Sequence, residues 1–271
     1  MHELPLNQAF GLRGLATPVA PQALAVVAHG DNRTEQPLLW RLCGALNQLG
    51  YNVSVLDATV AESTANPGLL DLLDYSWATP APSDNGPIWQ VLPAALGLQS
   101  LCAPGSTPAL SLQRLGQAFE SNTLVLLYAG VNTLVQLLGR TGLRPLLCVS
   151  GEKGSLLTTY LALKRLLGQG QLDPTLLNMV REGPHGHSAA AVAQALQDCA
   201  RNFLAHAVHP VRIDPLQAEG PLEADMRHLA TGLLGHAVPL LHTAPTVGYH
   251  GAGPGGLRDG KLGFGDMSRS H

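Results

Sequence analysis

The polar stretch HGDNRTEQ, residues 29–36, lies where this chain could best do chemistry. It follows a short apolar run, residues 23–28 (ALAVVA), which is typical of a strand buried on both faces. Residues 37–49 come next, with leucines at helical spacing, a proline in the first turn and Gly50 just past the end, which predicts a helix. Strand–loop–helix junctions of this kind bind phosphate at the helix N-terminus. The stretch is therefore a candidate nucleotide site.

The pattern of buried run, loop and amphipathic segment recurs along the chain. A second apolar run at 52–56 completes a strand–helix–strand unit, which implies parallel strands and a right-handed crossover. The predicted fold class is α/β, with a doubly wound, mainly parallel sheet flanked by helices. Further strands are predicted at 124–127, 146–149 and 176–180, helices at 131–138, 155–167, 188–206 and 222–234, and mostly loop at 77–108, around one strand near 89–92.

Composition divides the 271 residues into one large domain with two shorter ends. We predict an N-terminal segment at 1–20, an α/β domain at 21–242 and a glycine-rich, disordered tail at 243–271. The formal net charge of −3 argues against a nucleic-acid-coating surface. The four scattered cysteines fit reduced thiols, and neither a signal peptide nor an 18-residue apolar stretch is found, so a cytoplasmic protein is expected. The histidine pairs at 185/187 and 206/209 have no matching ligands at metal spacing, so no metal site is predicted.

Several segments, in order, resemble the MinD/ParA family of P-loop ATPases, and within it the FlhG (FleN, YlxH) group of flagellar-number regulators. The apolar run at 23–28 leads into a loop of the family's length, and LLWRLCGALNQLGYNVSVLDA resembles the helix and strand that follow it. Later, GSLLTTYLALKRLL, LLNMVRE and VRIDP resemble a helix, a strand and the closing segment of the family core. Each segment alone is a weak signal, and their order and spacing carry the resemblance.

The family's phosphate loop reads Ser-Gly-Lys-Gly-Gly-Val-Gly-Lys-Thr, and its chemistry is missing here. The three glycines after the first lysine, both lysines and the Mg²⁺-binding hydroxyl are replaced, and no lysine precedes Lys153. The resemblance therefore implies that ATP and Mg²⁺ binding are lost, that no catalytic residue remains, and that the protein is a pseudo-ATPase. In family order the substituted loop positions are Ala28, His29, Gly30, Asp31, Asn32, Arg33, Thr34, Glu35 and Gln36.

Two further family motifs are altered. The switch motif Asp-Ala-Asp is present as Asp57-Ala58-Thr59, which keeps the first acid and loses the second. The third family strand ends in an acidic motif that senses Mg²⁺, and the equivalent segment here, LVLLYAG, carries Tyr128. Loss at these positions agrees with loss in the loop.

Ahead of the first strand, Asn7-Gln8-Ala9-Phe10-Gly11-Leu12-Arg13 resembles the Asp-Gln-Ala-x-x-Leu-Arg segment of FlhG proteins. The resemblance implies binding to the FlhF-type GTPase and stimulation of its GTP hydrolysis, through residues Asn7, Gln8, Ala9, Leu12 and Arg13. In a helix Gln8 and Leu12 would share one face, so a glutamine could orient water in a partner's active site. The competing interpretation is an amphipathic turn that packs on its own domain.

The resemblance also implies contact with flagellar C-ring components and recruitment to the cell pole. Membrane contact is expected to be weak or indirect, because no basic amphipathic helix ends the chain. Two alternative hypotheses stay open: a pseudo-ATPase scaffold of another polar or envelope machine, such as cellulose secretion, and a divergent active ATPase.

Overall fold

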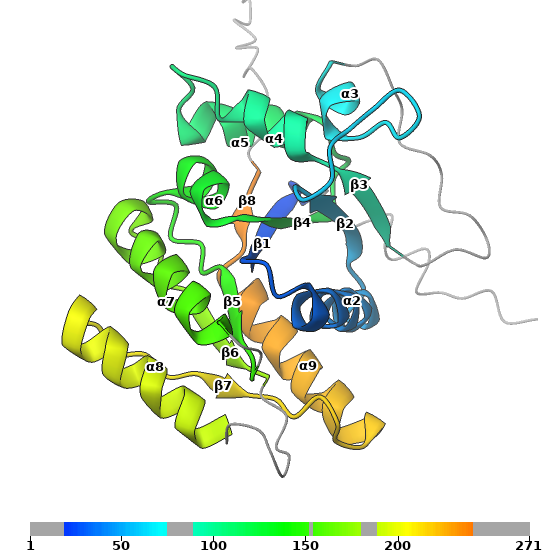
Figure 1. Cartoon of the computed structure of the whole chain (residues 1–271). Coiled ribbons are helices and arrows are strands. Elements are labelled where there is room, and N and C mark those ends of the chain that lie inside the picture. Colours follow the sequence, from blue (N-terminus) through cyan, green and yellow to red (C-terminus); the bar gives the residue numbers. More distant parts are fainter. Residues whose placement is uncertain (1–18, 75–88, 152–153, 180–188, 241–271) are drawn as a thin grey trace, which may run out of the picture.

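The computed structural model describes residues 19–74, 89–151, 154–179 and 189–240. Its centre is an eight-stranded, mostly parallel sheet in the order β3-β2-β4-β1-β5-β6-β7, with β8 paired antiparallel to β1 (Figure 1). This confirms the predicted α/β class. The strands are β1 (Gln22–Ala28), β2 (Asn52–Asp57), β3 (Gln90–Pro93), β4 (Thr123–Gly130), β5 (Leu146–Val149), β6 (Thr175–Asn178), β7 (Val211–Arg212) and β8 (Val238–Pro239).

Helices cover both faces of this sheet (Figure 1). Helix α7 (Ser155–Arg165) continues into a π-helical turn at Leu166–Gly170. The helices are α2 (Asn32–Gln48), α3 (Leu69–Leu73), α4 (Ala95–Leu101), α5 (Pro108–Gln117), α6 (Val131–Leu138), α7 (Ser155–Arg165), α8 (Ala189–Leu204) and α9 (Glu219–Leu234).

Strand β1 lies inside the sheet, and each face of the sheet carries one half of the hydrophobic core. Because side chains alternate along a strand, Ala23, Ala25 and Val27 face the half built with α4 to α8. Leu24 and Val26 face the other half, built with α2 and α9. Residues 23–27 of this run are buried and Ala28 is partly buried, which is why a continuous apolar run predicted a central parallel strand.

Strand β1 pairs with one strand on one side and with two strands on the other. Strand β4 pairs along all seven residues of β1 on one side. On the other side β5 pairs only at Val26, and β8 pairs at Gln22 and Ala23. The carboxyl ends of β1, β4 and β5 therefore meet at one edge, and this edge positions the candidate site.

The structure corrects the expected loop at 77–108 and the expected start of α2. Helix α4 lies inside that range, together with β3, while residues 75–88 are outside the described part. Helix α4 could not be recognised from the sequence, because it has only seven residues and the segments around it are rich in proline and serine. Helix α2 begins at Asn32, five residues before the proline predicted to start it.

The start of α4 depends on a buried carboxylate, that of Glu62. Its Oε2 accepts the N–H of Leu96 at 2.7 Å, and its Oε1 accepts the N–H of Gly97 at 2.8 Å. It also accepts the N–H of Leu70 in α3 at 3.3 Å. One side chain thus satisfies amides at the first turns of two short helices, where no backbone carbonyl can reach them.

We predict that Glu62→Ala lowers the free energy of unfolding by about 2–4 kcal/mol, because it leaves buried amides unpaired. Chemical denaturation monitored by circular dichroism measures this change. The matched control is Glu223→Ala, an exposed position on α9, for which we expect a change within about 0.5 kcal/mol. Equal effects at the two positions would contradict the assigned role of Glu62.

Candidate functional site

The connection between β1 and α2 is only three residues long, residues 29–31. Gly30 within it has φ +96°, a left-handed conformation that glycine adopts without strain. Asn32, Arg33 and Thr34 already belong to the helix, and Gln36 points to solvent from its second turn. The predicted eight-residue loop is therefore wrong in length, because most of it is helical.

Glu35 is fully buried, and its carboxylate turns back into this connection. Its Oε1 accepts the N–H of His29 at 3.1 Å and the N–H of Asp31 at 3.0 Å. The arrangement resembles a capping box, in which a carboxylate one turn into a helix accepts amides that precede it. Glu35 thus explains how α2 can begin early: its side chain satisfies the amides that a tighter connection would leave unpaired.

The other oxygen of the same carboxylate binds the core of the sheet. Tyr128, buried in β4, donates its hydroxyl to Glu35 Oε2 at 2.5 Å. Burial, together with this bond and the charge of Glu35, raises the pKa of the Tyr128 phenol well above its usual range. The Tyr128 hydroxyl therefore keeps its proton and acts as a donor. Glu35 and Tyr128, which lie 93 residues apart in the sequence, form one buried pair.

Asp57, at the end of β2, lies opposite Tyr128 in the parallel register. Its Oδ1 accepts both the N–H of Thr59 at 2.8 Å and the hydroxyl of Thr59 at 2.6 Å. The switch-like segment is therefore closed on itself by a local turn. The sequence-predicted positions of the loop, β2 and β4 are brought together at the sheet edge.

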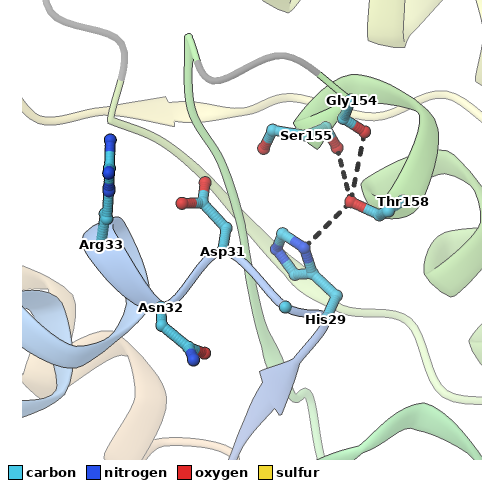
Figure 2. A pocket seen from close by; sticks show the side chains of 8 residues that line it. His29, Asp31, Asn32, Arg33, Gly154, Ser155 and Thr158 are labelled. Carbon is cyan, nitrogen blue, oxygen red and sulfur yellow. Dashed lines mark hydrogen bonds between the residues drawn. The ribbon is translucent and has the colours of Figure 1, made fainter.

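His29 links this edge to β5 and α7 (Figure 2). Its ring lies with Nδ1 3.1 Å from the Thr158 hydroxyl and Nε2 2.9 Å from the carbonyl oxygen of Cys148. The same Nε2 is 3.3 Å from Glu35 Oε1. His29 thus joins the Glu35 carboxylate to β5 through the Cys148 carbonyl and to α7 through Thr158.

Between the starts of α2 and α7 lies an open pocket of about 410 Å³ (Figure 2). Asp31 borders it, and its carboxylate accepts a hydrogen bond from the Ser150 hydroxyl. The lining has one acid and one arginine and contains no lysine among the described residues. Its residues are His29, Gly30, Asp31, Asn32, Arg33, Gly154, Ser155 and Thr158.

Sequence reasoning missed the β5–α7 side of the site. Cys148, Ser150, Ser155 and Thr158 approach the connection because β5 lies beside β1. Ser155 and Thr158 belong to a segment that resembles a family helix, but nothing in that resemblance placed them at this site. Ser155 supports the turn by accepting the N–H of Ser150 at 3.0 Å. The N-terminal segment that carries Asn7, Gln8, Ala9, Leu12 and Arg13 lies outside the described residues.

We predict that Tyr128→Phe lowers the free energy of unfolding by about 1–3 kcal/mol near neutral pH, because Glu35 Oε2 loses its donor. Above about pH 10 the unfolded wild-type chain releases the phenol proton while the folded chain keeps it. Wild-type stability should therefore fall there, and the deficit of the variant should shrink. Urea denaturation from pH 7 to pH 11 measures this; Tyr51→Phe, half-buried beside the same core half, is the control. A deficit that grows with pH would contradict the assignment.

Comparison with known proteins supports the fold alone. No model of a known protein family matches the sequence, and no curated protein matches it. Among solved structures, the MinD cell division protein of Aquifex aeolicus is similar at TM-score 0.52 with 13% sequence identity, over 82% of this chain and 100% of that one. The MinC:MinD cell division protein complex of the same organism gives TM-score 0.51 and 14% identity, over 82% and 99% of the two chains. The chain thus has the fold of the MinD cell division protein.

Proposed function

We propose that this protein is a pseudo-ATPase of the MinD/ParA fold, which acts as a regulator without a nucleotide cycle. The observation that carries the proposal is the buried Glu35 carboxylate, which accepts the amides of His29 and Asp31. Backbone amides between the first strand and helix are the groups that cradle phosphate in P-loop proteins. In this chain an internal anion already binds two of them.

Entry of a phosphate would require that carboxylate to leave. Departure would break its bonds to two amides and to the Tyr128 hydroxyl, and bonds to a charged group contribute about 1.5–3 kcal/mol each. A phosphate that entered beside the carboxylate would face its negative charge and that of Asp31 in a partly desolvated site. Both routes oppose nucleotide binding.

The helix start argues in the same direction. A phosphate-wrapping loop needs several consecutive residues free of the helix, and glycine at the points of closest approach. Here only residues 29–31 connect β1 to α2, and Asp31, Asn32 and Thr34 stand where the resemblance places glycines. Replacing a single residue would not restore this geometry.

We predict that the full chain binds neither ATP nor ADP, with or without Mg²⁺, and hydrolyses neither. Isothermal titration calorimetry at millimolar nucleotide, with a phosphate-release assay, measures this. Glu35→Lys should fail to bind as well, because the glycine positions remain filled. Micromolar affinity of the wild type would overturn the proposal and favour a divergent active ATPase.

As the regulated process, we propose flagellar number and placement, in the manner of FlhG, by stimulation of an FlhF-type GTPase. Support comes from the resemblance of residues 7–13 to the FlhG segment and from its position ahead of the first strand. A regulator of this kind needs the core as a carrier and the segment as the active element. The α/β core can serve as this carrier, and a carrier needs no nucleotide cycle.

We predict that a peptide of residues 6–13 raises the GTPase rate of the FlhF protein from the same organism. In the full chain Gln8→Ala should remove most of the stimulation, because it removes the amide that would orient water. Leu12→Asp should weaken binding, because it places a charge on the contact face. Single-turnover GTP hydrolysis measures both.

The matched control is Gln36→Ala, an exposed glutamine on α2 far along the chain from the segment, which should stimulate as the wild type does. Thermal melting of all variants checks that the core is intact. If Gln8→Ala and Leu12→Asp both stimulate like the wild type, the FlhF assignment is wrong. A scaffold role in another envelope machine, such as cellulose secretion, would then be the stronger hypothesis.

A further inference from the structure

Three side chains with metal-binding atoms converge behind the β1–α2 connection. They are His29 from the connection, Glu35 from α2 and Cys148 from β5. One ligand atom from each lies within 4.8 Å of the other two. The His29 side chain is 5% exposed, and those of the other two are essentially inaccessible to solvent. The cluster thus offers one nitrogen, one oxygen and one sulfur donor.

Two of the three distances between ligand atoms match the edges of a small tetrahedron. His29 Nε2 is 3.3 Å from Glu35 Oε1 and 3.7 Å from Cys148 Sγ. With zinc bonds of about 2.0–2.1 Å to nitrogen, 2.0–2.2 Å to oxygen and 2.3 Å to sulfur, tetrahedral geometry places such pairs about 3.3 and 3.6 Å apart. The third pair, Glu35 and Cys148, lies within 4.8 Å, so these two ligand atoms must approach each other for one ion to contact all three.

We propose that His29, Glu35 and Cys148 form a binding site for one Zn²⁺ ion. The inference goes beyond the proposed function and does not depend on it. Imidazole, carboxylate and thiolate are all ligands that zinc accepts, and three protein ligands leave a fourth position for water. Thiolate and carboxylate together balance the two charges of the ion, so the loaded site is neutral overall.

Neighbouring groups already orient two of the ligands, His29 and Glu35. Thr158 lies 3.1 Å from His29 Nδ1, and its hydroxyl can donate to the Ser155 carbonyl oxygen at 3.1 Å, so Nδ1–H can donate to Thr158 and leave Nε2 for the metal. Tyr128 donates to Glu35 Oε2, while the His29 and Asp31 amides donate to Oε1 itself, so the ion would replace one amide at that atom. Such second partners are a regular feature of metal sites.

Binding releases one proton, that of the Cys148 thiol, and moves the imidazole proton of His29 from Nε2 to Nδ1. Burial and the nearby charges of Glu35 and Asp31 raise the pKa of the Cys148 thiol, so without metal it is protonated. Zinc binding releases this proton, and Nε2 gives up its hydrogen bond to the Cys148 carbonyl. That carbonyl keeps a donor, because the Thr159 hydroxyl also reaches it at 3.0 Å. His29 lines the open pocket, which gives an ion a route from solvent.

The test uses the full chain, freed of metal by a chelator and titrated with Co²⁺ and then with Zn²⁺. We expect one equivalent of Co²⁺ to produce the near-ultraviolet charge-transfer band of a thiolate–cobalt bond, and Zn²⁺ to displace it and raise the melting temperature. Cys148→Ala should abolish the band, and His29→Gln should weaken Zn²⁺ binding at least a hundredfold. Thr158→Val should weaken it about tenfold.

Cys43→Ala is the matched control, because Cys43 is a buried thiol of the same core half outside the cluster. It should retain the band and the affinity. A wild-type chain without the charge-transfer band overturns the proposal, even if a variant fails to fold. So does a Cys148→Ala chain that binds Zn²⁺ like the wild type, because histidines elsewhere would then account for the binding. Nucleotide binding has no part in these readouts, so this test and that of the proposed function can fail separately.

Discussion

The buried carboxylate of Glu35 is the constraint on which the site edge of the sheet depends. A charge removed from water is costly unless hydrogen bonds replace its hydration. Here two amides, a phenol and the nearby imidazole of His29 surround it, and it lies in the first turns of α2, where the helix dipole favours an anion. Because these partners come from β4 and the connection, this one side chain of α2 fixes the spacing of β4, the connection and α2.

Much of the fold could be predicted from the sequence, because parallel strands that are buried on both faces consist of short runs of apolar residues. The run at 146–149 and the helix at 131–138 agree with β5 and α6 residue for residue. The start of α2 could not be predicted in this way. Pro37 is a common first-turn signal, but here it lies in the second turn, because Glu35 satisfies the amides that precede it. That compensation needs Tyr128, a partner from a distant strand.

The candidate site was predicted on one side only. Residues 29–36, Asp57, Thr59 and Tyr128 were recognisable because the family resemblance gave each an expected identity. Neither Cys148 nor Thr158 was expected at the site, although Thr158 lies in a segment that resembles a family helix; the pairing of β5 beside β1 brings both to His29. For the same reason the sequence predicted no metal site: the three residues proposed as ligands are separated by up to 119 positions.

The substitutions at this edge are better understood as one coupled change than as independent losses. By resemblance, a cation at position 35 would face a phosphate and an acid would end β4; in this chain the acid is at 35 and the neutral donor Tyr128 is on β4. Loss of a lysine alone would leave buried polar groups without partners, yet every buried side-chain nitrogen and oxygen in the described residues is hydrogen-bonded. The edge is therefore repacked around its own anion, and a chain with such an edge can keep the fold without a bound ligand to complete it.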